Sequence, residues 1–121
     1  MFQVVGAAAD FAELIYRVTG MFPAEERYIT VPLLRDHALV ILENASLGMA
    51  RFDISYRYIY ITRAIMSLND IHAHFIFCKT MALLDQGLFN ELVTAENILR
   101  SRLNEALKLV DQTDPFAQDP F

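Results

Sequence analysis

Glycine and proline are scarce in this sequence, with 4 residues of each in a chain of 121. They gather at a few breaks instead of at short regular intervals, which favours long helices over many short strands. Cysteine occurs once, at Cys78, which excludes an intrachain disulfide and a four-cysteine zinc site. A single free thiol is typical of a reducing compartment, and we therefore expect a cytoplasmic protein.

Basic residues are outnumbered, because 10 Lys and Arg stand against 15 Asp and Glu and give a net charge of −5. Non-specific binding of nucleic acid rests on a basic face that neutralises phosphates, and this composition argues against it. A local basic patch stays open as an alternative. Long uncharged runs are missing too, since none reaches the roughly 18 residues of a membrane-spanning helix.

The apolar start of the chain lacks a basic segment and meets Asp10 and Glu13 early, so we do not interpret it as a signal peptide. We expect no membrane among the partners. Apolar side chains are plentiful, at 55% of the residues, with a mean hydropathy of +0.29. Such a surplus in one small domain indicates that some side chains are buried between subunits, which predicts a homo-oligomer.

Apolar residues recur at spacings of three and four over four windows, roughly 2–19, 31–47, 53–84 and 88–110. Short connections make neighbouring helices antiparallel. The sequence therefore predicts an all-α fold, an antiparallel up-down four-helix bundle that forms a single domain over residues 1–110. The buried stripe expected on the third helix consists of Ile54, Tyr58, Ile61, Ile65, Leu68, His72, Phe75 and Ala82.

Residues 111–121 are predicted to form a non-helical tail that contains Asp-Pro-Phe twice, at 114–116 and 119–121. One interpretation is a short linear motif for a partner's groove. The other, which we favour, is a frayed terminus whose phenylalanines rest on the bundle or on a neighbouring subunit.

The segment SYRYIYIT, residues 55–62, fits two structures. Read with period two, Tyr56, Tyr58 and Tyr60 share one face of a strand and could stack on RNA bases. The longer window excludes this, because no glycine or proline occurs from Asp53 to Leu84 and the apolar spacing is helical. The later part, HFIFCKTMALL, is apolar almost all round, which predicts a helix buried on several sides.

The candidate catalytic and metal-binding side chains do not form a known motif. His72 and His74 are two residues apart, so they point to different sides of a helix and do not share a metal ion, and His37 is on another helix. Cys78 follows His74 by four residues, but a buried small hydrophobic role fits it better. We expect no enzyme, no catalytic, cofactor-binding or metal-binding residue, no cofactor and no small-molecule substrate.

Arg51, Arg57 and Arg63 recur every six residues near Tyr56 and Tyr60. Guanidinium groups bind phosphates and tyrosines stack on bases, so these arginines are the best local candidates for nucleic-acid contact. The alternative that we favour is solvated or interfacial arginines that pair with acidic residues.

The stretches FPAEERY at 22–28, LRDHA at 34–38 and NASLGMAR at 44–51 follow an ordered pattern. The pattern resembles that of the four-helix-bundle proteins encoded in intervening sequences of bacterial large-subunit ribosomal RNA genes. The resemblance covers roughly residues 3–110. The matching residues are Phe22, Pro23, Glu26, Tyr28, Leu34, Arg35, Ala38, Asn44, Gly48 and Arg51.

This resemblance implies a cytoplasmic homo-oligomer, typically a pentameric barrel, with no known enzymatic activity. A related branch, the accessory proteins of diversity-generating retroelements, binds RNA and a reverse transcriptase. The resemblance also implies a polar cluster of motif residues. That cluster consists of Glu26, Tyr28, Arg35, Asn44 and Arg51.

Three positions depart from the family pattern, since Asp36 stands where a second arginine is common, Leu47 where a glutamate is usual and Ala45 where isoleucine is. A polar site built from that arginine and glutamate is therefore altered here. We expect a non-enzymatic homo-oligomeric scaffold or binding module whose partner the sequence does not name. The alternative is an accessory protein that binds RNA or a reverse transcriptase.

Overall fold

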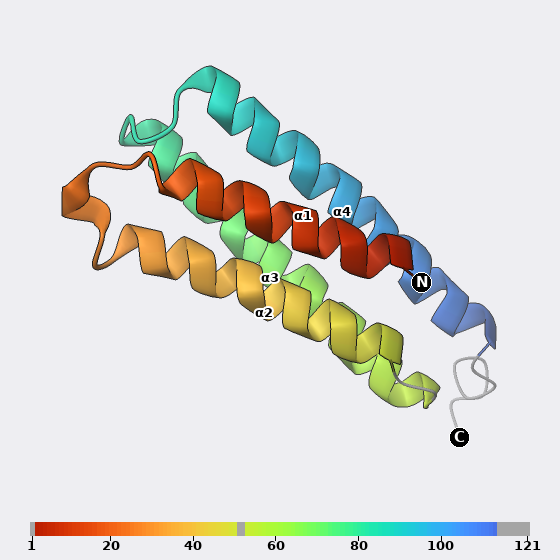
Figure 1. The fold of residues 1–121 in the computed structure, drawn as a ribbon. Helices are drawn as coiled ribbons and strands as arrows, with labels where there is room; N and C mark the ends of the chain where they lie inside the picture. Colours follow the sequence, from red (N-terminus) through yellow and green to blue (C-terminus); the bar gives the residue numbers. More distant parts are fainter. Residues whose placement is uncertain (1, 51–52, 114–121) are drawn as a thin grey trace.

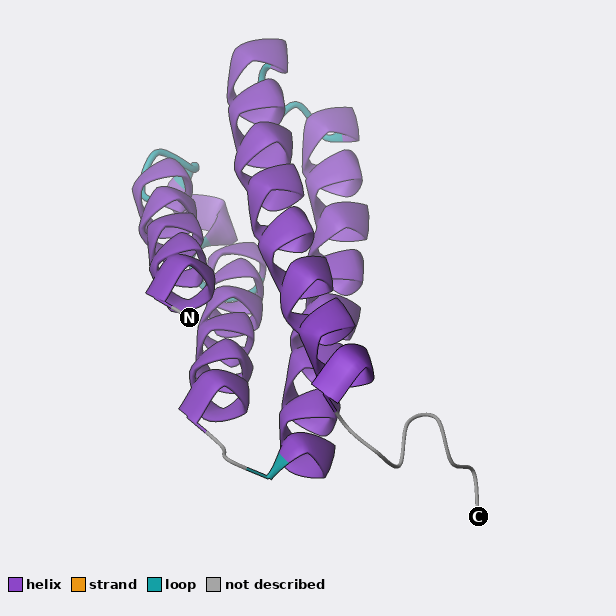
Figure 2. Cartoon of the chain, turned by 90° about the vertical axis from the view of Figure 1, so that its right-hand side faces the viewer, coloured by secondary structure: helices purple, strands orange, loops and turns teal. Residues whose placement is uncertain are grey.

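A computed structural model describes residues 2–50 and 53–113, and in these ranges the chain is all-α. The helices are α1 (Phe2–Thr19), the short 3-10 helix η1 (Ala24–Glu26), α2 (Thr30–Ala50), α3 (Ile54–Thr80) and α4 (Gln86–Thr113). Consecutive long helices run in opposite directions (Figure 1). The described ranges contain only helices and loops (Figure 2). The predicted all-α four-helix bundle is confirmed for the single chain.

The four long helices form a ring in which each packs on two neighbours, α1 on α2 and α4, and α3 on the same two. Inside the ring, Phe11 of α1 meets Phe75 of α3 edge-to-face, with ring centroids 6.1 Å apart. Both rings are almost fully buried, so the diagonal pair of helices is joined through the core. The largest other buried apolar side chains are Ile15, Leu34, Ile41, Ile61, Leu68, Ile71, Leu92, Leu99 and Leu103.

The buried stripe predicted for α3 is only partly right. Ile61, Leu68 and Phe75 are fully buried as expected, whereas Tyr58 is 46% exposed. Ala64, Ile71 and Cys78 take the remaining core positions. Because this helix is apolar on most sides, the spacing of apolar residues does not identify its inner face.

The segment 55–62 is helical and lies in the first turns of α3. Asp53 is the N-cap, and its side chain accepts a hydrogen bond of 2.9 Å from the backbone N–H of Ser55. This cap satisfies a backbone donor that the first turn leaves unpaired. Tyr56 and Tyr60 lie one turn apart on one side of the helix and Tyr58 lies on the other, so the three rings do not form the flat platform that a strand would offer.

Helix α3 ends at Thr80, although we expected it to continue to about Leu84. Ala82 has a φ of 61°, in the left-handed region. The N–H of Leu83 donates to the carbonyl of Cys78 at 2.8 Å, and the N–H of Ala82 donates to the carbonyl of Lys79 at 3.0 Å. This pair of bonds is the Schellman motif, which terminates a helix even where no glycine is present.

The fourth helix, which we expected from about residue 88, also begins earlier in the chain, at Gln86. The side chain of Asp85 accepts a hydrogen bond of 2.8 Å from the N–H of Leu88, which caps α4. Gly87 is therefore inside the first turn of α4.

At its other end α4 continues to Thr113, so residues 111–113 of the predicted tail are helical. No proline restricts the backbone until Pro115, which disfavours helix at the residue before it. The two Asp-Pro-Phe repeats lie outside the described residues.

The later part of α3 was expected to be buried on several sides, and in the single chain it is not. Ile76 and Phe77 are 49% and 57% exposed, and Met81, just after the helix, is 57% exposed. None of the helices in the described ranges has both the length and the apolar character needed to cross a membrane.

Candidate functional site

Arg35 is the member of the predicted polar cluster with the most contacts. Its Nε donates to Oγ1 of the buried Thr19 at 2.9 Å, and its Nη2 donates to the carbonyl of Tyr16 at 3.1 Å. The guanidinium carbon lies 4.4 Å from the centroid of the Tyr16 ring. Arg35 thus joins α2 to the C-terminal end of α1, where a positive charge is favourable.

The other described members of the cluster have different partners. Glu26 accepts a hydrogen bond from the hydroxyl of Thr30, and Tyr28 is 80% exposed. Asn44 donates to the carbonyl of Val40 in its own helix at 2.9 Å. Among these described residues and Arg35, no member hydrogen-bonds to another.

The distance along α2 explains why Arg35 and Asn44 do not hydrogen-bond to each other. Arg35 and Asn44 are nine residues apart on α2, which is about 13 Å, and Arg51 lies outside the described residues.

The two described arginines of the nucleic-acid candidate point to different sides of α3. Arg57 Nε donates to the carbonyl of Gly48 on α2 at 3.3 Å. Arg63 lies over the ring of Tyr60, 5.5 Å from its centroid. A spacing of six residues leaves side chains about a third of a turn apart, so the two guanidinium groups do not present one common surface.

A buried carboxylate that sequence reasoning missed lies between α3 and α4. Glu96 is 2% exposed, and its Oε1 is 2.7 Å from Nδ1 of His72. Its Oε2 accepts a hydrogen bond of 2.7 Å from Nη2 of Arg100. The guanidinium group of Arg100 also donates a hydrogen bond to Asn69 on α3. Both oxygens of Glu96 are occupied, so the group holds two helices in register rather than acting as a free base.

The sequence contained a signal for this residue. Glu96 follows Leu92 by four positions and precedes Leu99 by three, which places it on the buried stripe of α4. Arg100 is four residues further on and is a suitable ion-pair partner.

His37 of α2 and His74 of α3 lie beside each other, with ring centroids 5.2 Å apart and ring planes inclined by 39°. Burial and the neighbouring His37 lower the pKa of His74 below its usual 6.5, and the negative charge of Asp70 partly opposes this. Sequence reasoning treated His37 as separate, because the register of α2 against α3 is not visible in the spacing of either helix.

Cys78 is a buried core residue, as the sequence suggested. Burial raises the pKa of its thiol to about 11, and the negative charge of Glu26 shifts it in the same direction. Thiolate, the nucleophilic form, is therefore scarce at neutral pH.

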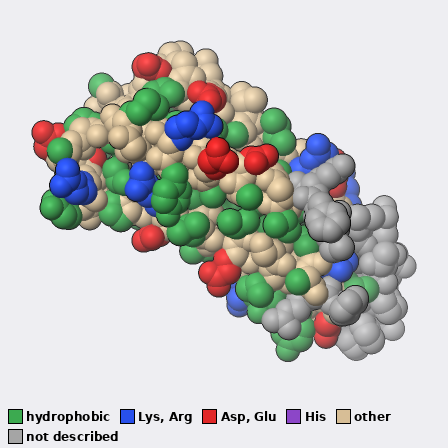
Figure 3. All heavy atoms as spheres, in the orientation of Figure 1, with side chains coloured by type: hydrophobic (Ala, Val, Ile, Leu, Met, Phe, Trp, Pro, Cys, Tyr) green, Lys and Arg blue, Asp and Glu red, His purple; other side chains and the backbone are tan. Residues whose placement is uncertain are grey.

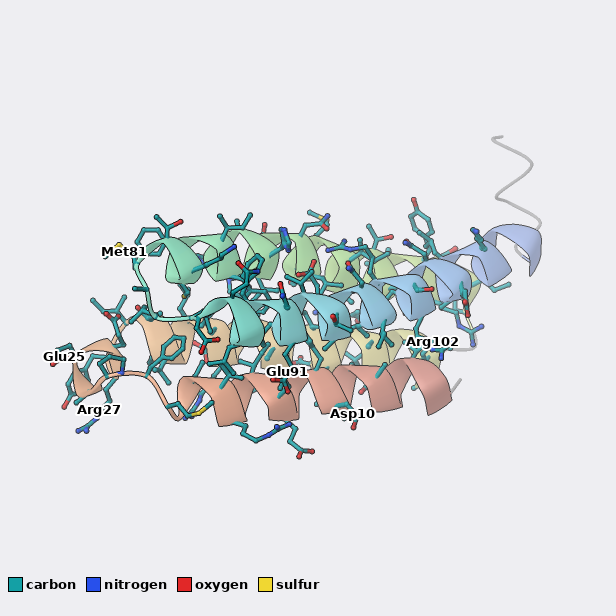
Figure 4. The ribbon with its side chains drawn as sticks, turned by 90° about the horizontal axis from the view of Figure 1, so that it is seen from above. Asp10, Glu25, Arg27, Met81, Glu91 and Arg102 are labelled. Carbon is teal, nitrogen blue, oxygen red and sulfur yellow. The ribbon has the colours of Figure 1, made fainter. Side chains whose placement is uncertain are left out.

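An open groove of about 480 Å³ runs between α1 and α4. Its lining includes Gly6 and charged side chains of both signs, and Figure 4 shows Asp10 on α1 and Glu91 and Arg102 on α4. Arg17 and Glu91 form an exposed ion pair of 3.9 Å across it. The mixture of charges favours neither an anion nor a cation.

A comparison with known proteins found no protein-family model and no curated protein that matches the sequence.

Proposed function

We propose that this chain is a non-enzymatic, homo-oligomeric scaffold or binding module that associates through the outer face of α3. That face consists of Ile59, Met66, Ala73 and Phe77, together with the charged residues Arg63 and Asp70. The observation that carries the proposal is the exposure of Ile59, Met66 and Phe77, at 40%, 60% and 57%.

These positions lie along one side of the helix. Met66 follows Ile59 by seven residues, or two turns, and Phe77 follows Met66 by eleven, or three turns. The opposite side of α3 is the fully buried core side. A helix that is apolar on both sides is typical of one that is covered on both sides.

The charges on the outer face support a second copy of the chain as the cover. Arg63 and Asp70 are also two turns apart, so the face carries one positive and one negative charge along its length. A neighbouring copy that carries both acidic and basic side chains can pair with each of these two charges. Figure 3 shows the other side of the molecule, where α1 and α2 lie in front of α3 (Figure 1), and hydrophobic side chains lie between charged ones there as well.

The resemblance to the intervening-sequence proteins is part of the proposal, and it implies five subunits. Gly48 supports it. A Cβ added there would lie 2.8 Å from Cδ1 of Ile61, so α2 and α3 approach each other too closely for a larger residue. This gives a physical reason for the glycine of the motif.

Binding rather than catalysis is supported by the state of the candidate side chains. The Cys78 thiol is buried and protonated at neutral pH, and the ring of His72 is held by Glu96. Cys78 is therefore not arranged as an activated nucleophile, and His72 is not arranged as its base.

Sedimentation velocity of substituted proteins tests the association surface. Ile59→Glu and Met66→Glu each place a charge on the outer face of α3 and are expected to shift the protein to the monomer. Ile98→Glu is the matched control, because Ile98 is 53% exposed on α4 and lies away from this face. Oligomers that persist in both α3 variants, or that dissociate equally in the control, contradict the proposal.

A second candidate function is binding of RNA, as in the retroelement accessory proteins. Arg63 stacked on Tyr60, with Tyr56 one turn away and 51% exposed, favours it. Fluorescence anisotropy with a labelled RNA should then show binding that weakens steeply as salt rises. Arg63→Ala should abolish it, and binding unchanged by this substitution removes the residue from the site.

A further inference from the structure

His37 and His74 are the two imidazoles that the bundle brings together from different helices. The fold fixes both, because α2 and α3 form an antiparallel pair with close packing at Gly48. Both side chains are half-buried, so neither is free to turn fully into solvent and neither is sealed in the core. The third histidine, His72, contacts Glu96 on the α4 side of α3 instead.

The separation of the two rings matches that of two ligands on one metal ion. Zinc binds imidazole nitrogen at about 2.0–2.1 Å in a tetrahedral arrangement, which places the centres of two bound rings roughly 5 Å apart. The observed separation is 5.2 Å. The separation of the ring centres is therefore compatible with two imidazoles on one ion, which each ring would reach by rotation of its side chain.

The charges around the pair also favour a cation. Asp70 lies one turn before His74 on the same helix and is close enough to affect its titration. In the described ranges no group of three or more His, Cys, Asp or Glu side chains is arranged around an ion, so two protein ligands are what the chain offers.

We propose that His37 and His74 form a two-histidine site for a divalent transition-metal ion of the zinc, nickel and copper class, with water in the remaining coordination positions. Imidazole is a preferred ligand of these ions, and magnesium and calcium, which prefer oxygen ligands, are excluded. The site lies within one chain, so it does not depend on self-association.

Isothermal titration calorimetry with zinc chloride at pH 7.5 tests the site. We expect one ion per chain in the unmodified protein. His37→Gln and His74→Gln should each weaken binding about tenfold or more, because two linked ligands gain at least that much from their proximity. His72→Gln is the matched control and should bind zinc as the unmodified protein does. Absence of binding heat, or equal losses in all three variants, overturns the proposal.

A second measurement needs no substitution and so does not depend on how the variants fold. Nickel(II) is paramagnetic and broadens the NMR signals of the rings that bind it. Substoichiometric nickel should broaden the ring signals of His37 and His74 equally, and more strongly than those of His72, which lies further from the ion. Broadening of all three rings to the same extent would show that the pair merely packs, and would overturn the site.

Discussion

At several positions in this bundle, the choice of residue depends on contacts with the neighbouring helix more than on the helix that contains it. Gly6 and Gly48 are both helical, but a Cβ on Gly6 would meet nothing within 4 Å, whereas one on Gly48 would lie 2.8 Å from the fully buried Ile61. The same contrast separates the histidines, since His72 faces α4 and His74 faces α2. Such differences arise from helix packing and are not visible in the local sequence.

Gly48→Ala should therefore lower the free energy of unfolding. Overpacking costs about 1–3 kcal/mol, and the better helix propensity of alanine returns about 1 kcal/mol. Gly6→Ala is the control and should raise stability by up to about 1 kcal/mol, since it gains propensity without a clash. Urea denaturation measures both. Shifts of the same sign in the two variants would contradict the close approach of α2 and α3.

The histidine pair should make stability depend on pH. The pKa of His74 in the folded state lies below its usual 6.5, so the unfolded chain binds the proton more readily. Stability is then fully present above pH 6.5 and is lost as the pH falls towards the folded pKa. Burial lowers this pKa most, His37 across the helix interface lowers it further, and Asp70 on α3 raises it. An NMR titration should place the midpoint of His74 below 6.5, and a midpoint above that value would refute the account.

At the scale of elements, the sequence predicted the four helices well because an apolar period of three and four is a strong signal over long windows. It predicted the ends of the helices less well. Glycine was taken as the marker of the break after α3, but the chain turns at Ala82 and Asp85 through backbone and side-chain hydrogen bonds. Such capping signals involve only a few residues, and in the sequence they are obscured by the longer apolar pattern around them.

Ala82→Gly should stabilise the end of α3. A non-glycine residue in the left-handed region costs roughly 1–2 kcal/mol, and the extra freedom of glycine in the unfolded chain offsets part of the gain. We expect a net increase of about 0.5–1 kcal/mol in the free energy of unfolding. Ala9→Gly, at an exposed position inside α1, should cost about 1 kcal/mol. A loss in both variants would show that Ala82 is not in the conformation described.

Glu96 should matter more than any exposed ion pair. Glu96→Gln removes the charge that His72 and Arg100 share between α3 and α4, and it should cost about 1–3 kcal/mol. Glu105→Gln is the matched control, because Glu105 pairs with Arg102 at 4.0 Å on the surface. Exposed pairs contribute about 0–1 kcal/mol. Equal midpoints of thermal unfolding in the two variants would contradict the structural role of Glu96.

At the scale of the whole molecule, the composition and the fold point to the same conclusion. An apolar content of 55% is more than this bundle buries, and the excess includes Ile59, Met66 and Phe77 on the outer face of α3. The sequence indicated that apolar side chains are in excess, but not where on the surface they lie. Helix α3 is apolar on most sides, and only its packing distinguishes the inner face from the outer one. The histidine pair and the burial of Glu96 were harder to predict than the apolar surplus, because both depend on the rotation of one helix against another.

The most direct test of the account is the mass of the unmodified protein in solution, measured by multi-angle light scattering over a dilution series. The account predicts a stable multiple of the 13.8 kDa chain at micromolar concentration, and the resemblance to the intervening-sequence proteins predicts five copies. A mass of 13.8 kDa at every concentration would contradict it, because the outer face of α3 would then be exposed in the functional molecule.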